Sequence, residues 1–402
     1  MAFAAEAVVH DEQLDKKKIK LISFISFLLG FSQAFLMYVL SDYFRQALGN
    51  ENVGVFFFGA YAVVLLLLLN THKFLKRLGE EATFFLLALA QVALGMLLVF
   101  SSPSIAGVIF LMAYIVVSYL VIVVLDIILE SFSEDRRSGR IRGLHLVIVN
   151  AGFLLGPFLS MHILDKYDFS GLFFLSMLLN MAIFIIGLIG LHSKNIRFGE
   201  DLTTRDLVKK VFINSNLMRI YFISLVLEFF YALMVVYTPL YLLDRGLSWD
   251  SIGIVFTIML LPFVILQYPA GVIADKKIGE KEMIIAALII MSISTASVFF
   301  INTSSILIWG VALFLTRIGA ALVEVLRDSY FYKKIDGRDM DIISFFRTGR
   351  SVAYISAAAL SALLLLFFPL KSIFLLVAVV ALLALYPAFK LEDSKGEKEL
   401  AR

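Results

Sequence analysis

The chain has 402 residues, of which 61% are apolar and only 17% charged, and its formal net charge is +3. A soluble domain carries about a quarter charged residues, so this composition excludes an ordinary soluble enzyme or binding domain. The chain has no cysteine, which excludes disulfides, thiolate metal sites and a cysteine nucleophile.

Twelve apolar runs follow one another along the chain, each long enough for a helix that crosses a bilayer, which needs about 20 residues. The runs are continuously apolar, whereas the strands of a membrane barrel are ~10-residue segments of alternating polarity. The first run follows several lysines but lacks a small-residue cleavage pattern, so we expect a span and not a signal peptide. The predicted spans are 21–44, 53–70, 82–101, 104–129, 143–162, 170–191, 218–243, 248–270, 283–301, 305–332, 342–367 and 370–389.

The basic residues are distributed unevenly between the connections. The N-terminal segment and every second connection after it hold 27 Lys and Arg, whereas the other connections hold 4. Cytoplasmic loops of membrane proteins carry the excess of basic residues. The sequence therefore predicts that both termini are cytoplasmic. A miscounted span would scramble this alternation, so the charges also support the count of twelve.

The longest internal connection divides the spans into two sets of six. We expect a first bundle over residues 1–192, a cytoplasmic linker over 193–217 and a second bundle over 218–402. A gapless shift of 198 residues places Asp126 on Glu324, Glu130 on Asp328 and several neighbours on like residues. Both copies approach the same face, so the repeat is parallel. The expected fold class is an all-α membrane protein with twelve transmembrane helices in two pseudo-symmetric six-helix bundles.

A loop motif lies between the eighth and ninth spans. It consists of Gly271, three residues, Asp275, two lysines, then Gly279 and a further basic residue. With the two six-helix halves, this motif resembles that of the major facilitator superfamily, although it has one extra residue and Glu280 at a basic position. The matching loop of the first half lacks the Gly and the Asp. A short charged turn that only sets topology is the alternative.

The fifth span carries a second motif. Gly143, Gly152, Gly156 and Pro157 have the spacing that antiporters of this superfamily carry in the same span, although a final Gly pair is replaced by Ser and Met. The resemblance implies export. The alternative is ordinary packing, because small residues four apart allow membrane helices to approach closely.

Ionisable residues inside spans are costly and are therefore candidates for function. Glu228 lies about ten residues into the seventh span, and Arg317 lies at a similar depth in the tenth. We expect Glu228 to carry a proton during transport and Arg317 either to pair with it or to bind an anionic solute. A pair that alternates with conformation is the preferred hypothesis, and a static buried ion pair is the alternative.

Further charged residues approach the cytoplasmic ends of spans four, ten and eleven. We expect them to form a cytoplasmic gate, with salt bridges that form when the cavity opens outward and break when it opens inward. Arg317 and Glu324 are seven residues apart and so share one helix face. Side chains that reach the headgroups are the alternative, most plausible for Glu130, Arg327 and Asp328. The predicted gate residues are Asp126, Glu324, Asp328, Arg347, Arg350 and the loop residues Gly271, Asp275 and Gly279.

The remaining candidates are polar residues predicted to line a central cavity, each of which can instead be a packing residue. They are Gln33, Tyr38, Asn150, Tyr231 and Gln267. No Gly-rich phosphate loop, catalytic triad or histidine cluster with metal spacing is present in the sequence. We therefore expect no enzyme activity, no cofactor, no metal and no nucleic-acid partner.

The family resemblance implies a secondary active transporter that works by alternating access, with its site between the halves. The first expectation is proton-coupled export of an amphipathic or drug-like compound. Nutrient uptake by proton symport or facilitated diffusion is the alternative, and a transporter-like receptor or a membrane-embedded enzyme is a remote one. The expected partners are a small solute, protons and the lipid bilayer. The expected form is a monomer in the plasma or inner membrane.

Overall fold

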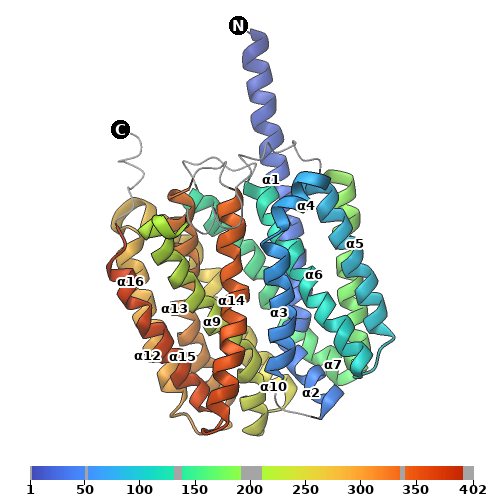
Figure 1. Ribbon diagram of the computed structural model, residues 1–402, viewed down its shortest axis with the longest axis vertical. Helices are drawn as coiled ribbons and strands as arrows, with labels where there is room; N and C mark the ends of the chain where they lie inside the picture. The colour runs from blue at the N-terminus through green and yellow to red at the C-terminus, as the bar shows by residue number, and fades with distance from the viewer. Residues whose placement is uncertain (1, 50–52, 131–137, 192–210, 336–339, 393–402) are drawn as a thin grey trace.

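The structure is a computed structural model that describes residues 2–49, 53–130, 138–191, 211–335 and 340–392. These residues form a bundle of roughly parallel and antiparallel helices (Figure 1). The first turns of α1 and the last described residues lie at the same end of the bundle. We call this the NC end and the opposite end the far end.

The helices follow the predicted spans closely, although several spans are built from more than one helix. The first bundle contains α1 (Ala2–Met37), α2 (Leu40–Leu48), α3 (Gly54–Leu68), α4 (Thr71–Leu78), α5 (Glu80–Val99), α6 (Ile105–Glu130) and α7 (Ser138–Gly190). The second contains α9 (Ser215–Asp244), α10 (Trp249–Ile265), α11 (Gln267–Ile273), a π-helical turn (Ala274–Ile278), α12 (Glu280–Val298), α13 (Ile306–Lys333), α14 (Met340–Leu365), α15 (Ser372–Leu383) and α16 (Leu385–Phe389).

Twelve spans are confirmed within the described residues. Eleven helical segments are long and apolar enough to cross a membrane, and the shorter apolar α3 supplies the twelfth span. The helix α7 contains both the fifth and the sixth spans, joined at Asp168, where the backbone leaves the helical region with φ 54° and ψ −167°. The predicted linker 193–217 lies largely outside the described residues, which resume at Val211.

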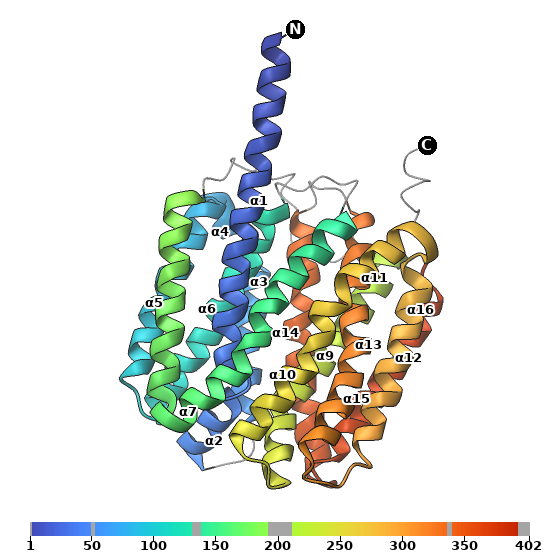
Figure 2. The same cartoon turned by 180° about the vertical axis from the view of Figure 1, so that it is seen from behind.

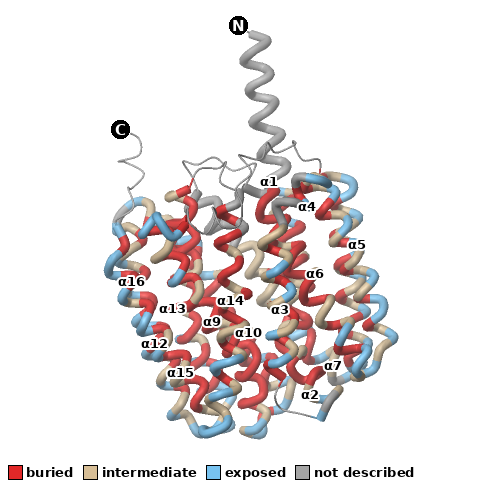
Figure 3. Tube along the Cα trace, viewed as in Figure 1, coloured by how far each residue is buried: buried red, intermediate tan, exposed pale blue. Residues whose placement is uncertain are grey.

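The two bundles contact each other mainly along two sides of the molecule, and α7 also contacts α11 and α13. On the side shown in Figure 1, α3 packs against α14, and on the opposite side, shown in Figure 2, α7 packs against α10. Buried residues are concentrated where helices face one another inside the molecule, and exposed apolar residues cover its outer surface (Figure 3). This is the expected distribution for helices surrounded by lipid tails, which are as apolar as leucine.

The pseudo-symmetry is visible in one turn of each bundle. Gly79 before α5 has φ 79° and ψ 161°, and Gly279 before α12 has φ 85° and ψ 164°. Each glycine is followed by a glutamate that is almost fully buried, Glu80 and Glu280. The region of positive φ and extended ψ is essentially open to glycine only. The third span of each half therefore begins with the same backbone conformation.

The interior of the first bundle holds a polar network that the sequence analysis did not anticipate. Asn180 of α7 donates to the Tyr114 hydroxyl at 2.8 Å and accepts from the Ser32 hydroxyl at 3.0 Å. Gln91 of α5 donates to the Ser118 hydroxyl at 2.9 Å, and Ser176 lies 3.0 Å from Ser32. These buried bonds join α1, α5, α6 and the second part of α7 away from the interface between the bundles.

Candidate functional site

A cavity of about 190 Å³ lies between the two bundles. Its wall is built from α1, α6 and α7 of the first bundle and from α9, α10, α13 and α14 of the second. Six of the seven residues predicted for the central cavity line it. They are Gln33, Tyr38, Asn150, Glu228, Tyr231 and Arg317.

The charged groups of the cavity are distributed unevenly between the bundles. Asp126 is the charged lining residue from the first bundle, and the other seven belong to the second. These seven are Glu228, Arg317, Glu324, Arg327, Asp328, Arg347 and Arg350. The four arginines and four carboxylates balance in number, so the arrangement of pairs decides which charges are available to a solute.

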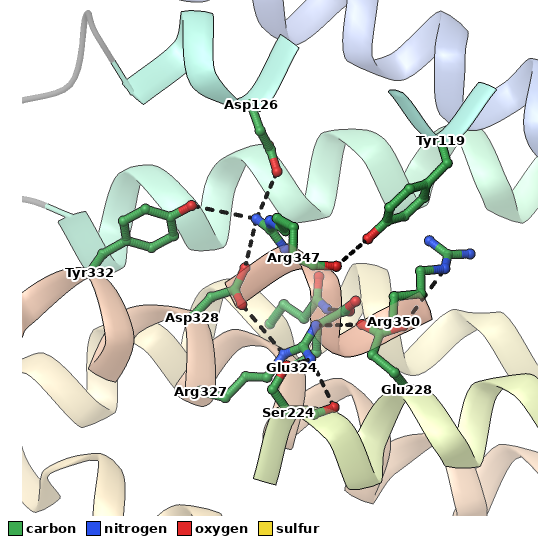
Figure 4. Close-up of polar contacts among 11 residues, drawn as sticks. Tyr119, Asp126, Ser224, Glu228, Glu324, Arg327, Asp328, Tyr332, Arg347 and Arg350 are labelled. Carbon is green, nitrogen blue, oxygen red and sulfur yellow. Dashed lines mark hydrogen bonds and ion pairs between the residues drawn. The ribbon is translucent and has the colours of Figure 1, made fainter. Parts of the chain in front are cut away.

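Glu228 of α9 pairs with Arg327 of α13, with 2.9 Å between its Oε1 and the Arg327 Nη2 (Figure 4). Its Oε2 lies 3.8 Å from the Arg350 Nε. Arg327 also donates to the Ser224 carbonyl at 3.3 Å and to the Ser224 hydroxyl. The charge of Glu228 is thus matched inside the second bundle.

Glu228 and Arg317 are therefore not paired in this conformation, so the alternative of a static ion pair is wrong, and a pair that alternates with conformation stays a prediction. Arg327 lies ten residues beyond Arg317 on α13, about 15 Å closer to the NC end. Depth counted along each span does not include helix tilt, and tilt decides which turns of α9 and α13 meet. Side chains that reach the headgroups were predicted as plausible for Arg327 and Asp328, which is also wrong, because both are at most 2% exposed. The Glu130 side chain lies outside the described residues.

An ion pair joins the two bundles at the NC side of the cavity. The Arg347 Nη2 of α14 lies 2.7 Å from the Asp126 Oδ2 of α6 and 3.6 Å from the Asp328 Oδ2 of α13 (Figure 4). The Tyr119 hydroxyl of α6 donates to the Arg347 carbonyl at 2.8 Å. The Arg350 guanidinium lies over the Tyr119 ring at 5.2 Å. Tyr119, seven residues before Asp126 and on the same helix face, is a contact that the sequence analysis missed.

A chain of amide hydrogen bonds forms a second connection between the bundles. Asn150 of α7 donates to the Gln267 Oε1 at 3.0 Å, and the Gln267 Nε2 donates to the Glu324 Oε2 at 2.6 Å. Gln267 does not line the cavity as predicted, but it connects two residues that do. Glu324 is therefore in contact with the first bundle through a neutral side chain.

Two charged lining residues stand outside the ion-pair network, namely Arg317 and Glu324. Within the described residues neither makes a salt bridge of 4.0 Å or less. Arg317 is 1% exposed, its Nη1 has no hydrogen-bond partner in the described part of the chain, and its guanidinium lies over the Phe230 ring at 4.8 Å. The buried Tyr231 hydroxyl also lacks a hydrogen-bond partner among those residues. Arg317 and Glu324 lie two turns apart on one face of α13, as the spacing predicts.

The loop motif makes its contacts inside the second bundle. The Lys333 Nζ lies 2.6 Å from both the Asp275 Oδ1 and the Glu280 Oε1, and Glu280 also accepts from the Ser329 hydroxyl at 2.8 Å. Gly271 is buried at the end of α11. In this conformation the ion pair of Asp275 with Lys333 thus connects the loop to the NC end of α13. Its membership of a gate between the bundles stays a prediction.

The fifth-span motif packs the fifth span against the first. A methyl group at Gly152 would overlap the Phe27 carbonyl of α1, and one at Gly156 would overlap Ala34. Pro157 lies within α7, beside Gly253 of α10. The Gly143 environment lies outside the described side chains. Close helix packing accounts for Gly152 and Gly156.

Contacts between the bundles on the far side of the cavity are mainly apolar. Gly54 of α3 faces Ala358 of α14, and the Tyr61 and Tyr354 rings stack with centroids 4.0 Å apart. Gly253 packs against Met161. The two sides of the cavity thus differ in chemistry, with ion pairs and amides toward the NC end and van der Waals contacts toward the far end.

The model of the Major Facilitator Superfamily matches residues 22–325 and 246–402, which together span nearly the whole chain. The chain belongs to the major facilitator superfamily. Members of this superfamily move small solutes across a membrane, so the prediction of an integral membrane transporter is confirmed at that level. No curated protein matches the sequence.

Solved structures of this superfamily fold are similar over almost the whole length. The human organic anion transporter MFSD10 (TETRAN) matches with a TM-score of 0.72 and 14% identity, over 93% of this chain and 99% of that one. A bacterial homologue of the iron transporter ferroportin in the outward-facing state matches with a TM-score of 0.72 and 15% identity, over 93% and 98%. The same homologue with soaked iron gives a TM-score of 0.68 and 14% identity, also over 93% and 98%. At these identities the likeness shows the fold alone.

Proposed function

We propose that this superfamily member transports a small organic anion that carries an apolar group, by alternating access around the central cavity. Arg317 binds the anionic group, and the aromatic and aliphatic wall accommodates the rest of the solute. The protein lies in the cell membrane with its NC end toward the cytoplasm. The connections assigned to that end hold 27 basic residues, and those assigned to the other end hold 4.

The state of Arg317 carries this proposal. A cation buried in a membrane protein normally has an acidic partner, because an unpaired charge in a low-dielectric region is costly. Arg317 has none among the described residues, whereas Arg327, Arg347 and Arg350 each have one. Guanidinium groups bind carboxylates and phosphates through paired hydrogen bonds. An anionic solute supplies the missing partner.

The surroundings of Arg317 favour an amphipathic anion of modest size. The phenols of Tyr38 and Tyr231 border the guanidinium, and Leu260 and Phe263 extend the wall with apolar surface. The cavity of about 190 Å³ is smaller than the roughly 300–1,000 Å³ of pockets for drug-sized ligands. The structure therefore supports a small anion better than the drug-like compound first expected. The fold neighbour MFSD10, an organic anion transporter, is consistent with this class.

Export was predicted from the fifth-span motif, and it stays a prediction. Gly152 and Gly156 are accounted for by their contact with α1. A packing requirement is the same in an exporter and an importer, so the motif favours neither direction. Direction depends on how solute binding is linked to the driving ion.

The proposal is tested first by thermal unfolding of the purified protein with matched probes. Benzoate and phenylphosphonate carry an anion on an aromatic ring, whereas benzamide is neutral and benzylammonium is a cation. A ligand at about 100 times its Kd stabilises the folded state by about 2.7 kcal/mol. We expect stabilisation by an anion, loss of it in Arg317→Gln, and its retention in Arg245→Gln, whose arginine lies at the far end outside the cavity.

The unfolding of Arg317→Gln without ligand separates a binding role from a structural one. Removing a buried cation without an acidic partner is expected to leave the melting temperature unchanged or raise it. A fall of several degrees would indicate that the guanidinium supports the fold. Stabilisation by benzylammonium or by ferrous ion instead of the anions, or by the anions equally in Arg317→Gln, would overturn the proposal. Uptake of labelled benzoate into proteoliposomes then tests transport itself.

A further inference from the structure

We propose that Glu324 is the proton-binding site of the transporter, and that its protonation both favours an anion at Arg317 and loosens the Gln267–Asn150 link between the bundles. The anion part rests on the proposed function, and the link between the bundles does not. The two groups concerned are the charged lining residues left outside the ion-pair network, and both lie on one face of α13.

The hydrogen bonds of Glu324 distinguish it from the other cavity carboxylates. Glu228 and Asp126 each lie within 3 Å of a guanidinium nitrogen, at 2.9 Å and 2.7 Å. The partner of Glu324 is the neutral amide of Gln267, at 2.6 Å. Proton uptake by Glu228 would leave Arg350 without its acidic partner, and proton uptake by Asp126 would break the ion pair between the bundles. Proton uptake by Glu324, which is half-buried in the cavity wall, removes a charge that lacks an ion-pair partner among the described residues and leaves every ion pair in place.

The groups around Glu324 come from each element that faces the cavity there. Arg327 and Asp328 on α13 and Glu228 on α9 act on it electrostatically. α9 also contributes the Tyr231 phenol. The neutral groups that face Glu324 are the amides of Asn150 on α7 and Gln267 on α11, and the apolar Leu260 and Phe263 on α10. The remaining charged groups of the cavity on facing helices are Asp126 on α6 and Arg347 and Arg350 on α14. On α12, Glu280 contacts Lys333 and Ser329 toward the NC end. One cation faces two anions in the nearest set, which favours uptake of a positive charge.

The distance between Glu324 and Arg317 links the proton to the anion. Seven residues of helix separate them by roughly 10 Å along the axis. A negative charge at that distance weakens binding of an anion at Arg317, and a proton on Glu324 removes the effect. With an effective dielectric constant of about 20, the affinity for the anion rises on the order of tenfold. Binding of the proton therefore favours binding of the anion, and this cooperativity is what symport of the two requires.

The same proton acts on the contact between the bundles. An ionised Glu324 accepts a charge-assisted hydrogen bond from Gln267, which is oriented by Asn150 of the first bundle. Bonds to ionised groups are roughly twice as strong as neutral ones. Protonation thus weakens the chain that joins α7 to α11 beside the cavity. Uptake by symport, the alternative in the sequence analysis, follows for a proton gradient directed into the cell.

A test without ligand uses the absence of cysteine in the native chain. In a Val149→Cys background, next to Asn150, labelling by a soluble maleimide reports opening of this contact. We expect labelling, corrected for the pH dependence of the thiol with an exposed reference cysteine, to be several-fold faster at about pH 5.5 than at about pH 8. Glu324→Gln is expected to label fast at both pH values. The exposed Glu282→Gln is the control and keeps the response.

The second arm measures benzoate binding at the same two pH values, at both of which benzoate is ionised. The native protein is expected to bind on the order of tenfold more tightly at the lower pH, and Glu324→Gln to bind tightly at both. The assignment of Glu324 is overturned if the pH response persists in Glu324→Gln or disappears in Glu228→Gln instead. It is also overturned if the native protein shows no pH response in either arm. If labelling follows Glu324 while no anion binds at either pH, the role of Arg317 fails and the proton site stands.

Discussion

Arg347 of α14 and Asp126 of α6 form the ion pair that joins the two bundles in the described part of the chain, with 2.7 Å between the Nη2 and Oδ2 atoms. The side chains are 17% and 11% exposed, so the pair lies at the edge of the cavity and is shielded from most solvent. Asp328, at 3.6 Å, provides Arg347 with a second carboxylate inside its own bundle. Arg347 therefore keeps an acidic partner when the bundles separate, which suits a contact that opens and closes.

Asp126→Asn is expected to favour opening at the NC side. Loss of one partner of a partly buried pair costs about 1–3 kcal/mol, which corresponds to a change on the order of tenfold in the balance between closed and open states. A single cysteine at Ile122, in the cavity wall on the same helix, should label faster in the variant. Asp126→Glu is expected to restore slow labelling, and the exposed Asp250→Asn to leave it unchanged. Equal rates in all variants would show that this pair does not hold the bundles together.

Gly156→Ala is expected to destabilise the first bundle. The added methyl group overlaps Ala34 of α1, and overpacking of this kind costs about 1–3 kcal/mol. The measurement is thermal unfolding of the purified protein in detergent. Gly349→Ala on α14 is the matched control, because its methyl group would meet the Tyr221 ring at an ordinary 3.5 Å. If both variants melted alike, the close approach of α7 to α1 would not be required.

Substitutions at Gly79 and Gly279 test the shared turn of the two bundles. Asparagine tolerates the left-handed helical region but not positive φ with extended ψ. Gly79→Asn and Gly279→Asn should therefore each lower stability by about 1–3 kcal/mol. Gly49→Asn is expected to be tolerated, since Gly49 has φ 63° and ψ 22°. Chemical denaturation of the three variants in parallel compares these effects, and a loss in Gly49→Asn as large as in the other two would contradict the prediction.

Asn180→Leu tests the polar network of the first bundle. The substitution keeps the branching of the side chain at Cγ but removes the acceptor of the Ser32 hydroxyl and a donor to the Tyr114 hydroxyl. Ser32 and Tyr114 keep Ser176 as a partner, but each loses one hydrogen bond. The loss of a hydrogen bond costs about 0.5–1.5 kcal/mol, so the melting temperature should fall by several degrees. Ser294→Ala, whose hydroxyl bonds only to carbonyls of its own helix, should change it little. An unchanged melting temperature in Asn180→Leu would mean that the network does not stabilise the bundle.

Much of the candidate site was predictable because its chemistry is unusual for its location. A charge in a span of apolar residues is costly, so Glu228, Arg317 and Glu324 stand out in the sequence before any contact is known. The cavity wall contains all three. The pairing among them was not predictable in this way, and the sequence analysis assigned to Glu228 the proton that we propose for Glu324. Arg327 was predicted to reach the headgroups because it lies near the end of a span. In the structure its side chain is instead buried against Ser224 and Phe346.

The sequence by itself determined the twelve spans and their grouping in two halves. Backbone groups in a lipid tail region must bond within their own helix, so a span requires a continuous apolar run that hydropathy detects. The tertiary structure alone decided which charges meet. Helix tilt and rotation bring Arg327 to Glu228 and Arg347 to Asp126, and they leave Arg317 and Glu324 outside the ion pairs on one face of α13. Those orientations arise from side-chain packing between helices far apart in the chain, such as Gly156 against Ala34, which no local pattern specifies.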